Sequence, residues 1–571
     1  MPLARLGTGA TELERKYNVA AVRRPVLTLV ILSFLTFFLG LGRQAITDAD
    51  EGFYAEAARE MVESGDWLTP HFNYADRWQK PVLYYWLTAA TYAIAGVTEG
   101  AARFWSALSG LGLVLLTWSA SRKITGDDQT AWLAGAIVAT CCGYFAIARM
   151  ALPDLPLALC ITLSIWCVLQ ERWLLAGCAA GLGFLMKGPV ALVVPAIVIV
   201  PIWWREGRFR THAAGTSHAA RSFTVRDLGL AALVFALVGL PWYVAMTFTH
   251  GTAYLQSFFV GDNLERFATD RFNEPRGLWF YIPIVIGGML PWSMYMVVLP
   301  GRSLIDVLRR RRTLTDGEWR LLTWALVPLL FFTASIGKQP RYILPVLPPL
   351  AILLATSITV RLKPDSTYGK ASVAAATWMT AALYVALAVL LWRARPLFIN
   401  AYPALSLTAV LVMASAGLVL AGTALTGRWH RLPAIATGCA AALLLSVQFG
   451  ALVGIRPEPV EQMAALVSAQ RTQQEPVGEY QVFVRNLVFY ARFKQEELYD
   501  EARALDFVKS PQRVLLVLRE TDLPRLESVA GVSLRRLGQV RYLNTANLKF
   551  RTLLWPLPDQ DLETVLLVTN R

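Results

Sequence analysis

The chain has 571 residues, of which 55% are hydrophobic and only 16% are charged, and its formal net charge is +14. A soluble protein carries roughly a quarter charged residues, so this composition excludes a soluble enzyme, a disordered chain and a simple secreted domain. The mean hydropathy is +0.44. Together with many apolar stretches of about 20 residues, it predicts an all-α polytopic membrane protein.

The apolar stretches predict about 13 transmembrane helices. They cover residues 25–42, 101–121, 129–147, 155–170, 173–186, 189–204, 228–248, 278–299, 321–336, 342–358, 371–392, 404–426 and 432–454. We therefore expect a transmembrane domain over residues 25–454, preceded by a short segment over residues 1–24 and followed by a soluble domain over residues 455–571.

The basic residues are unevenly distributed between the loops on the two sides of these spans. The loops on the side of the N-terminus carry 24 Lys and Arg, and the membrane loops on the other side carry 13. Because cytoplasmic loops are enriched in these residues, the N-terminus is predicted to be cytoplasmic and the C-terminal domain to lie outside the cytoplasm. The same rule accounts for the basic net charge without a nucleic-acid partner.

The loop after the first span, residues 43–100, is long and is predicted to carry two helices at the membrane surface. Asp48, Asp50 and Glu51 open the first helix, in which apolar residues recur at helical spacing and charged residues fill the opposite face. The second helix covers the apolar stretch 82–95, which is short for a span. An acidic cluster beside the bilayer gains nothing from snorkelling, so it indicates a functional site.

Other unusual polar residues fall on the same side of the membrane. On the predicted topology, one face carries Asp50, Lys80, Asp154, Lys187, Arg266, Lys338 and Arg341. Acids and cations that gather on one side predict a site there rather than scattered membrane anchors.

The chemistry of this site is restricted by the motifs that the sequence lacks. It has no phosphate-binding loop for ATP, no dinucleotide fingerprint, and no zinc-protease or serine-hydrolase motif. A membrane enzyme acting outside the cytoplasm needs a substrate that is already activated and membrane-bound, and a polyprenyl-phosphate sugar meets both needs. Cations would hold the lipid phosphate as it leaves. A carboxylate would deprotonate the acceptor or stabilise the positive sugar centre.

Several motifs resemble those of the bacterial GT-C glycosyltransferases, which include the 4-amino-4-deoxy-L-arabinose lipid A transferases and the protein O-mannosyltransferases. The resemblance rests on Asp50 to Glu56, Gly65 to Trp67, Lys80-Pro81, Tyr85-Trp86, Lys187-Gly188, Asn263 to Phe267, Trp279 to Tyr281, Pro291-Trp292, Gly337 to Tyr342 and Leu344-Pro345. It implies a GT-C fold and an inverting transfer of a sugar from a polyprenyl-phosphate carrier. The acceptor would be a lipid, glycan or protein on the periplasmic face of a bacterial inner membrane.

The resemblance also implies roles for single residues. Asp50 would be the catalytic carboxylate, Asp154 a second functional acid, and Lys80 a contact for the lipid phosphate or the sugar. The arabinose transferases often have Arg where this chain has Phe53, and Glu where it has Gln79. Both departures cast doubt on an aminoarabinose donor but leave the transferase class in place.

The missing Arg at position 53 removes a phosphate contact that other cations would have to supply, namely Arg59, Arg77, Lys338 or Arg341. Further candidates for the lipid-phosphate pocket are Lys187, Arg266 and Tyr342. The change to Gln79 weakens the case for a metal or a second base. No cofactor is predicted with certainty; a divalent metal stays open, with Asp48, Asp50 and Glu51 as candidate ligands.

The segment 455–571 has the composition of a soluble protein and predicts a small extracytoplasmic α/β domain. The predicted strands are residues 481–485, 487–491, 513–518, 540–543 and 564–569, and the predicted helices are residues 460–470 and 523–529. The segment has no catalytic constellation of its own, so it either caps the site, contacts the acceptor or is a passive appendage.

Three other functions remain open at this stage. A transporter or lipid flippase keeps charged residues near the bilayer midplane and often has inverted repeats, and the sequence shows neither. En bloc oligosaccharide transfer would need a roomier cavity. A structural scaffold is disfavoured by the clustering of acids and cations.

Overall fold

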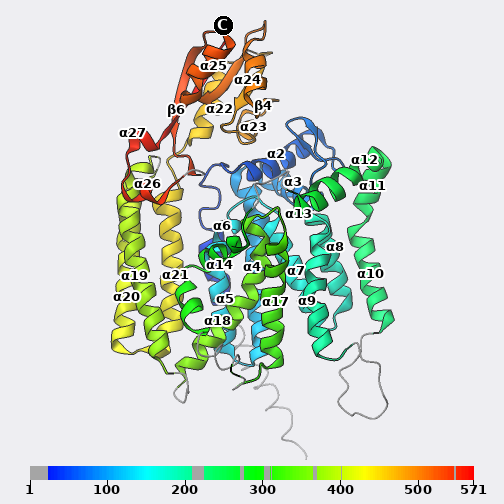
Figure 1. The fold of residues 1–571 in the computed structure, drawn as a ribbon, viewed down its shortest axis with the longest axis vertical. Coiled ribbons are helices and arrows are strands. Elements are labelled where there is room, and N and C mark those ends of the chain that lie inside the picture. Colours follow the sequence, from blue (N-terminus) through cyan, green and yellow to red (C-terminus); the bar gives the residue numbers. More distant parts are fainter. Residues whose placement is uncertain are drawn as a thin grey trace, which may run out of the picture.

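The structure is a computed structural model, and it describes residues 24–208, 224–269, 276–300, 309, 312–363, 369–399, 401–472, 474–545 and 548–571. The predicted cytoplasmic segment 1–24 lies outside the described residues except for Arg24. The described chain forms a bundle of long helices with a smaller part that contains a β-sheet at one end (Figure 1).

The helices of the bundle follow the predicted apolar stretches. They are the helix Arg24–Phe38, whose last turn is η1 (Phe34–Phe38), and α4 (Glu99–Thr125), α5 (Asp128–Ala139), α6 (Cys142–Ala148), α7 (Asp154–Leu169), α8 (Trp173–Lys187), α9 (Val190–Arg205), α10 (Val225–Gly239), α11 (Pro241–His250), η3 (Leu278–Phe280), α14 (Tyr281–Gly288), α15 (Ser293–Val298), α17 (Asp316–Ala334), η4 (Pro340–Val346), α18 (Leu347–Leu362), α19 (Ala371–Ala394), η5 (Arg395–Leu397), α20 (Pro403–Thr426), η6 (Trp429–Arg431), α21 (Leu432–Val447) and η7 (Gln448–Leu452).

Length and composition identify which of these helices can cross a membrane. Within the described residues, five are long and apolar enough, or up to seven if each of two bent pairs is one span. The bent pairs are α5 with α6 and α10 with α11. The second bend falls at Pro241, which has no N–H to continue the preceding helix. These findings confirm a helical polytopic membrane protein, while the count of 13 spans stays a prediction.

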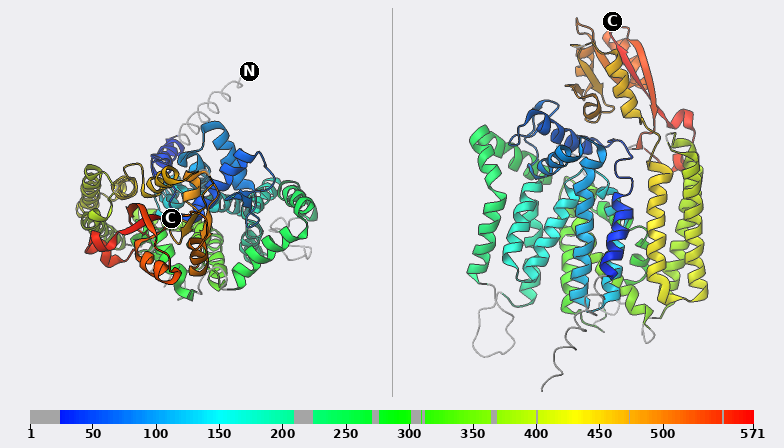
Figure 2. Two further views of the ribbon diagram at one scale, coloured as in Figure 1. Left: turned by 90° about the horizontal axis from the view of Figure 1, so that it is seen from above. Right: turned by 180° about the vertical axis from the view of Figure 1, so that it is seen from behind.

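The long first loop lies at the same end of the bundle as the sheet (Figures 1 and 2). It forms α2 (Ala49–Ser64), a hairpin of β1 (His71–Phe72) with β2 (Ala75–Asp76), and α3 (Leu83–Ala95). Helix α2 begins where the Asp48 carboxylate accepts the backbone N–H groups of Asp50 and Glu51, and it ends at Gly65, whose φ is 72°. The same end carries α12 (Thr252–Leu255), η2 (Gln256–Glu265) and α13 (Arg266–Ala268).

The charged face of α2 is buried, whereas the sequence pattern predicted a polar face opposite the membrane. The Glu51 carboxylate accepts two hydrogen bonds from the Arg103 guanidinium of α4, at 2.6 and 3.0 Å. Glu56 accepts from Arg59 in the same way, at 2.6 and 2.7 Å. Buried charges are tolerated when they are paired and hydrogen-bonded, so ion pairs within α2 and to α4 replace the expected contact with water.

The C-terminal part is a five-stranded sheet in the order β4-β3-β5-β7-β6. Its elements are α22 (Pro459–Gln470), β3 (Val477–Tyr480), α23 (Leu487–Ala491), β4 (Glu496–Leu498), α24 (Glu501–Val508), β5 (Leu515–Arg519), η8 (Glu520–Asp522), α25 (Leu523–Ala530), β6 (Arg535–Tyr542), α26 (Phe550–Leu554), α27 (Pro558–Asp561) and β7 (Glu563–Thr569). Strands β4, β3 and β5 are parallel, and β7 is antiparallel to both its neighbours. Helix α22 covers one face, and α24 and α25 cover the other.

One predicted strand of this part is a helix. Residues Leu487–Ala491 form α23, because a short apolar run cannot be assigned to strand or helix by periodicity alone. Residues 481–485, predicted as a strand, instead form bends and turns between β3 and α23, with positive φ at Gln481, Phe483 and Arg485. These residues therefore leave the sheet and form an irregular segment between β3 and α23.

Hydrogen bonds fix the C-terminal part to the first loop. The Glu458 carboxylate accepts the Ala45 N–H at 2.8 Å, and the Tyr490 hydroxyl accepts the Ile46 N–H at 2.7 Å. Asn73 of the hairpin exchanges two hydrogen bonds with the backbone of Gln495, at 2.7 and 2.9 Å. The sheet is thus held directly over α2 and the hairpin.

Candidate active site

A cavity of about 910 Å³ lies where the first loop, the bundle and the C-terminal part meet. Its wall within the bundle is largely apolar and comes from α7, α9 and α17. That wall includes Leu157, Ile161, Val190, Val193, Phe331 and Phe332. Six cationic side chains and five acidic ones also line it, all from the described residues. An apolar wall combined with converging charges suits a ligand with a lipid tail and an anionic head group.

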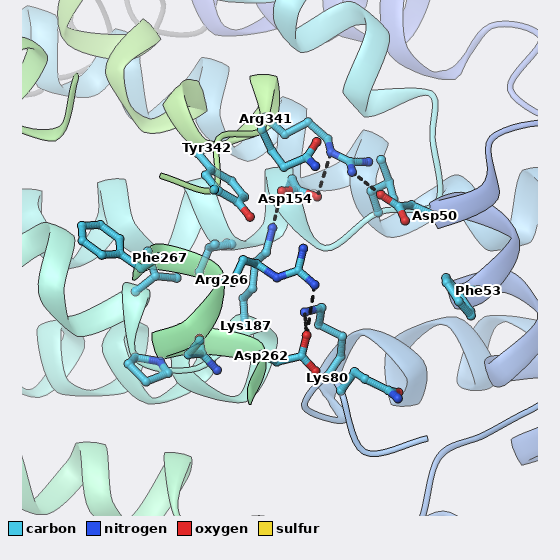
Figure 3. A pocket seen from close by; sticks show the side chains of 18 of the residues that line it. Asp50, Phe53, Lys80, Asp154, Lys187, Asp262, Arg266, Phe267, Arg341 and Tyr342 are labelled. Atoms are coloured by element: carbon cyan, nitrogen blue, oxygen red, sulfur yellow. Dashed lines mark hydrogen bonds and ion pairs between the residues drawn. The ribbon is translucent and has the colours of Figure 1, made fainter. Parts of the chain in front are cut away.

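Asp50 is the most accessible of the central carboxylates. Its place in the first turn of α2 is set by the Asp48 cap, and its side chain remains 46% exposed. The guanidinium of Arg341, at the start of η4, donates a hydrogen bond to Asp50 Oδ2 (Figure 3). Burial alone would raise the pKa of Asp50, but the charge and hydrogen bond of Arg341 lower it, and the net shift is downward. Asp50 is therefore an ionised carboxylate that a ligand can reach.

Asp154 lies behind Arg341 at the N-terminus of α7 and is almost fully buried. Lys187, at the last turn of α8, donates to Asp154 Oδ1 at 2.6 Å, and Arg341 Nε lies 3.9 Å from Asp154 Oδ2. Asp50, Arg341, Asp154 and Lys187 thus form a chain of alternating charges (Figure 3). Because Asp154 is enclosed by cations, it suits a role in holding Arg341 and Lys187.

A second group of charges faces the first across the cavity. Lys80, which follows the hairpin, lies 3.4 Å from Asp262 Oδ1, and Arg266 donates to the same oxygen at 3.1 Å (Figure 3). Burial lowers the pKa of Lys80 to about 8, although Asp262 opposes this shift. Two cations that share one carboxylate leave one unit of positive charge for a ligand.

A close backbone approach brings Arg266 to the segment that carries Arg341. A Cβ atom on Gly337 would lie 2.0 Å from the backbone oxygen of Arg266, so only glycine allows this approach. The Ile336 N–H also donates to the Phe267 oxygen at 2.9 Å. The segment Gly337 to Tyr342 therefore packs against the backbone of Arg266 and brings the two groups of charges together.

Comparison with known proteins agrees with this architecture. The family model described as dolichyl-phosphate-mannose-protein mannosyltransferase matches residues 26–253. An undecaprenyl phosphate-alpha-4-amino-4-deoxy-L-arabinose arabinosyl transferase 2 of Proteus mirabilis (strain HI4320) is 32% identical over 350 residues, which are 59% of this chain and 60% of that protein. The corresponding transferase of Aeromonas salmonicida (strain A449) is 34% identical over 348 residues, which are 58% and 60% of the two chains. The chain thus spans about 60% of the length of these curated relatives.

The solved structures extend the likeness over the whole chain. The crystal structure of ArnT from Cupriavidus metallidurans bound to undecaprenyl phosphate matches with a TM-score of 0.70 at 21% identity, and the match covers 96% of this chain and 98% of that one. The chain therefore has the same overall fold as that protein. The resemblance to transferases that use polyprenyl-phosphate sugars, predicted from the motifs, is confirmed.

Most of the residues predicted for the site converge on the cavity. These are Asp50, Arg77, Lys80, Asp154, Lys187, Arg266, Arg341 and Tyr342. Tyr342 presents its ring to Lys187, whose Nζ lies 5.1 Å from the ring centroid. The cavity therefore gathers residues from six separate stretches of the chain.

Two predicted cations lie outside the lining of the cavity. Arg59 is occupied by Glu56 and Glu63 of its own helix. Lys338 turns away and donates to the backbone oxygens of Ser335 and Arg276. Neither side chain is placed to replace the Arg that the arabinose transferases often have at position 53.

The three candidate metal ligands serve separate purposes. Asp48 caps α2, Asp50 pairs with Arg341 and Glu51 pairs with Arg103. Across the part of the chain that the structure describes, no group of three or more His, Cys, Asp or Glu side chains is arranged to hold a metal ion.

The polar residues of the cavity that sequence reasoning did not assign to the site include Asp262, Arg485, Glu497 and Tyr499. Asp262 had a weak signal, because it stands four residues before Arg266 in a polar loop. Arg485, Glu497 and Tyr499 had none, because they belong to the C-terminal part and reach the cavity only when it docks on α2.

Proposed function

We propose that this chain is a glycosyltransferase of a bacterial inner membrane that moves a sugar from undecaprenyl phosphate to an acceptor on the periplasmic face. The names of the curated relatives supply the donor class. In this proposal the N-terminus is cytoplasmic, about 13 spans form residues 25–454, and residues 455–571 form a periplasmic domain. The excess of Lys and Arg in the loops at the opposite end of the bundle supports this orientation.

The observation that carries the proposal is an accessible carboxylate, Asp50, in the same cavity as the cations Lys80 and Arg266. An inverting transfer needs both at once. One side of the anomeric carbon meets the acceptor and its base, and the other side meets the departing phosphate. A cavity of about 910 Å³ with an apolar wall has room for the sugar, the phosphate and the first part of a prenyl tail.

In the proposed reaction, Asp50 accepts the proton of an acceptor hydroxyl as its oxygen attacks the anomeric carbon. The bond between that carbon and the phosphate oxygen breaks, and its electron pair remains on undecaprenyl phosphate. Lys80 and Arg266 stabilise the growing negative charge of the phosphate. If the acceptor is itself a phosphate, it is already ionised, and Asp50 then stabilises the positive charge on the sugar instead.

Arg341, Asp154 and Lys187 act on Asp50 in this scheme. Arg341 keeps Asp50 ionised and limits its rotation through their hydrogen bond. Asp154 holds Arg341 and Lys187 in place from behind. We assign Tyr342 to positioning, because its ring lies beside Lys187.

The transporter alternative receives less support. The charged residues described above gather at one end of the bundle, next to the sheet (Figures 1 and 3). A transport pathway would instead place them near the middle of the membrane.

The test is transfer of radiolabelled sugar from an undecaprenyl-phosphate donor in proteoliposomes, with Asp50→Asn as the variant. Loss of a general base costs about 10²–10⁴ in rate, and the variant should still bind undecaprenyl phosphate. Asp559→Asn, at an almost fully exposed side chain of the C-terminal part, is the matched control and should transfer normally. A folded Asp50→Asn protein with normal turnover would refute the assignment.

A further inference from the structure

Two guanidinium groups lie against the ring of Phe53. The Arg77 Cζ atom lies 3.7 Å from the centre of this ring, and the Arg485 Cζ atom lies 4.1 Å from it. Arg77 directly follows the β1–β2 hairpin, whereas Arg485 ends the irregular segment 481–485 between β3 and α23. An arginine attracted to the face of an aromatic ring keeps its N–H groups free for another partner. Phe53 therefore serves as a platform that brings two cations together.

Neither guanidinium is neutralised by an ion pair. Among the described residues, Arg77 donates to the Tyr85 hydroxyl at 3.0 Å, and Arg485 donates to the Tyr499 hydroxyl at 3.5 Å, but no carboxylate lies within 4.0 Å of either. The buried Arg485 Nε has no hydrogen-bond partner among the residues that the structure describes. This differs from Lys80, Arg266, Lys187 and Arg341, each of which contacts an aspartate.

One acid of the cavity, Glu497, interacts electrostatically with both arginines. Glu497 lies on β4 and accepts a hydrogen bond from the Tyr499 hydroxyl. Burial raises the pKa of Glu497, and the charges of Arg485 and Arg77 only partly offset this. Glu497 and Asp50 thus both interact with Arg485 at longer range, but neither forms an ion pair with it.

The position of this platform separates it from the bundle. The apolar wall of the cavity comes from the membrane helices, whereas Arg485, Glu497 and Tyr499 come from the C-terminal part above them. A prenyl tail fits the apolar wall, so we expect Lys80 and Arg266 to bind the phosphate of the carrier. The platform lies on the side from which a second, water-facing substrate would enter.

We propose that Arg77 and Arg485, gathered on Phe53, form a second anion-binding subsite that selects acceptors with a negatively charged group. The inference rests on the proposed function and deepens it, because it assigns the C-terminal part a direct contact with the acceptor. It also gives Phe53 a role at a position where related transferases often carry Arg: the ring holds cations contributed by two other segments.

The test uses tungstate, a dianion of phosphate size with a strong anomalous X-ray signal, soaked into crystals of the full chain. We expect two peaks in the cavity, one beside Lys80 and Arg266 and one beside Arg77 and Arg485. A peak at the first position alone would overturn the subsite and leave the proposed function intact. Peaks at neither position would overturn the subsite and count against the proposed phosphate site as well.

Titration calorimetry in solution separates the subsite from an adventitious ion. With undecaprenyl phosphate saturating the first position, Arg485→Gln should weaken tungstate binding about tenfold or more, whereas Glu497→Gln should leave it equal or tighter. Arg503→Gln, at an exposed arginine of the same domain, is the control and should bind normally. Equal binding by Arg485→Gln and the wild-type chain would show an adventitious ion only. Equal losses in Arg485→Gln and Glu497→Gln would show a folding defect and would also refute the proposal.

Discussion

Arg341 donates a hydrogen bond to the carboxylate of Asp50 and thereby joins the start of η4 to the first turn of α2. Two segments that lie far apart in the sequence meet at the one accessible carboxylate of the central charge chain. This contact lowers the pKa of Asp50 against the opposing effect of burial. Several consequences of the structure can be measured from this contact outward.

Replacing Arg341 should move the acid limb of the pH profile. In Arg341→Gln, burial still raises the pKa of Asp50, and of the two guanidinium charges that lower it only that of Arg485 remains. In the proposed reaction Asp50 acts in its ionised form, so kcat/KM should begin to fall at a higher pH than in the wild-type chain. Transfer rates measured from pH 4 to 8 give the shift, and Arg341→Lys, which keeps the charge, should recover part of it. An unchanged acid limb in Arg341→Gln would show that Arg341 does not control Asp50.

Binding of undecaprenyl phosphate should weaken at alkaline pH. Burial lowers the pKa of Lys80 to about 8, so its ammonium group is charged below this pH and loses its proton above it. The dissociation constant should rise by up to about tenfold per pH unit above that value. Lys80→Arg stays charged throughout and should bind with little pH dependence. Lys509→Arg, on the surface of the C-terminal part, should keep the wild-type profile.

Gly52→Ala should displace the segment that carries Arg485. A Cβ atom on Gly52 would lie 2.4 Å from the Arg485 oxygen and 2.5 Å from Asn486 Oδ1. Alanine in a helix is normally favoured over glycine by about 0.5–1 kcal/mol, so a loss of stability here would report the clash. We expect a lower thermal midpoint and weaker tungstate binding, because the platform on Phe53 is disturbed.

Gly229→Ala is the matched control, because Gly229 is also helical and a Cβ atom there meets nothing within 4 Å. It should be neutral or slightly stabilising. If Gly52→Ala behaves in the same way, the C-terminal part does not dock on α2 as described.

The buried pair of Glu51 and Arg103 should dominate the stability of the first loop. Both side chains are 3% exposed, and Arg103 also donates to the backbone oxygens of Leu41, Gln44 and Ala45. Arg103→Met leaves Glu51 charged and unpaired, which costs about 3–5 kcal/mol. Thermal unfolding in detergent should show a clearly lower midpoint. A midpoint equal to that of the wild-type chain would contradict the pairing.

The double variant Glu51→Gln with Arg103→Met should recover only part of that loss. The stranded charge is removed, but the three backbone oxygens still lack their donor. Full recovery would mean that the stranded charge of Glu51 caused the whole loss and that the backbone contacts of Arg103 add no stability.

The sequence predicted the membrane helices and much of the site for a local reason. Apolar runs of span length and acids next to a bilayer are features of neighbouring residues, and the motifs around Asp50, Lys80 and Arg341 are short. Those residues do converge on one cavity. The local reading was wrong for residues 487–491, which form α23, because a short apolar run fits either structure.

The sequence by itself predicted the class of protein, the gathering of its unusual charges on one side, and the carboxylate and cations that line the cavity. Only the tertiary structure decided which cations have partners. It placed Arg59 against Glu56 within α2, turned Lys338 toward backbone oxygens, and brought Arg485 to Phe53. The reason is physical: whether a charge is free to bind a ligand depends on which groups surround it in space, and those groups come from distant segments that no local pattern records.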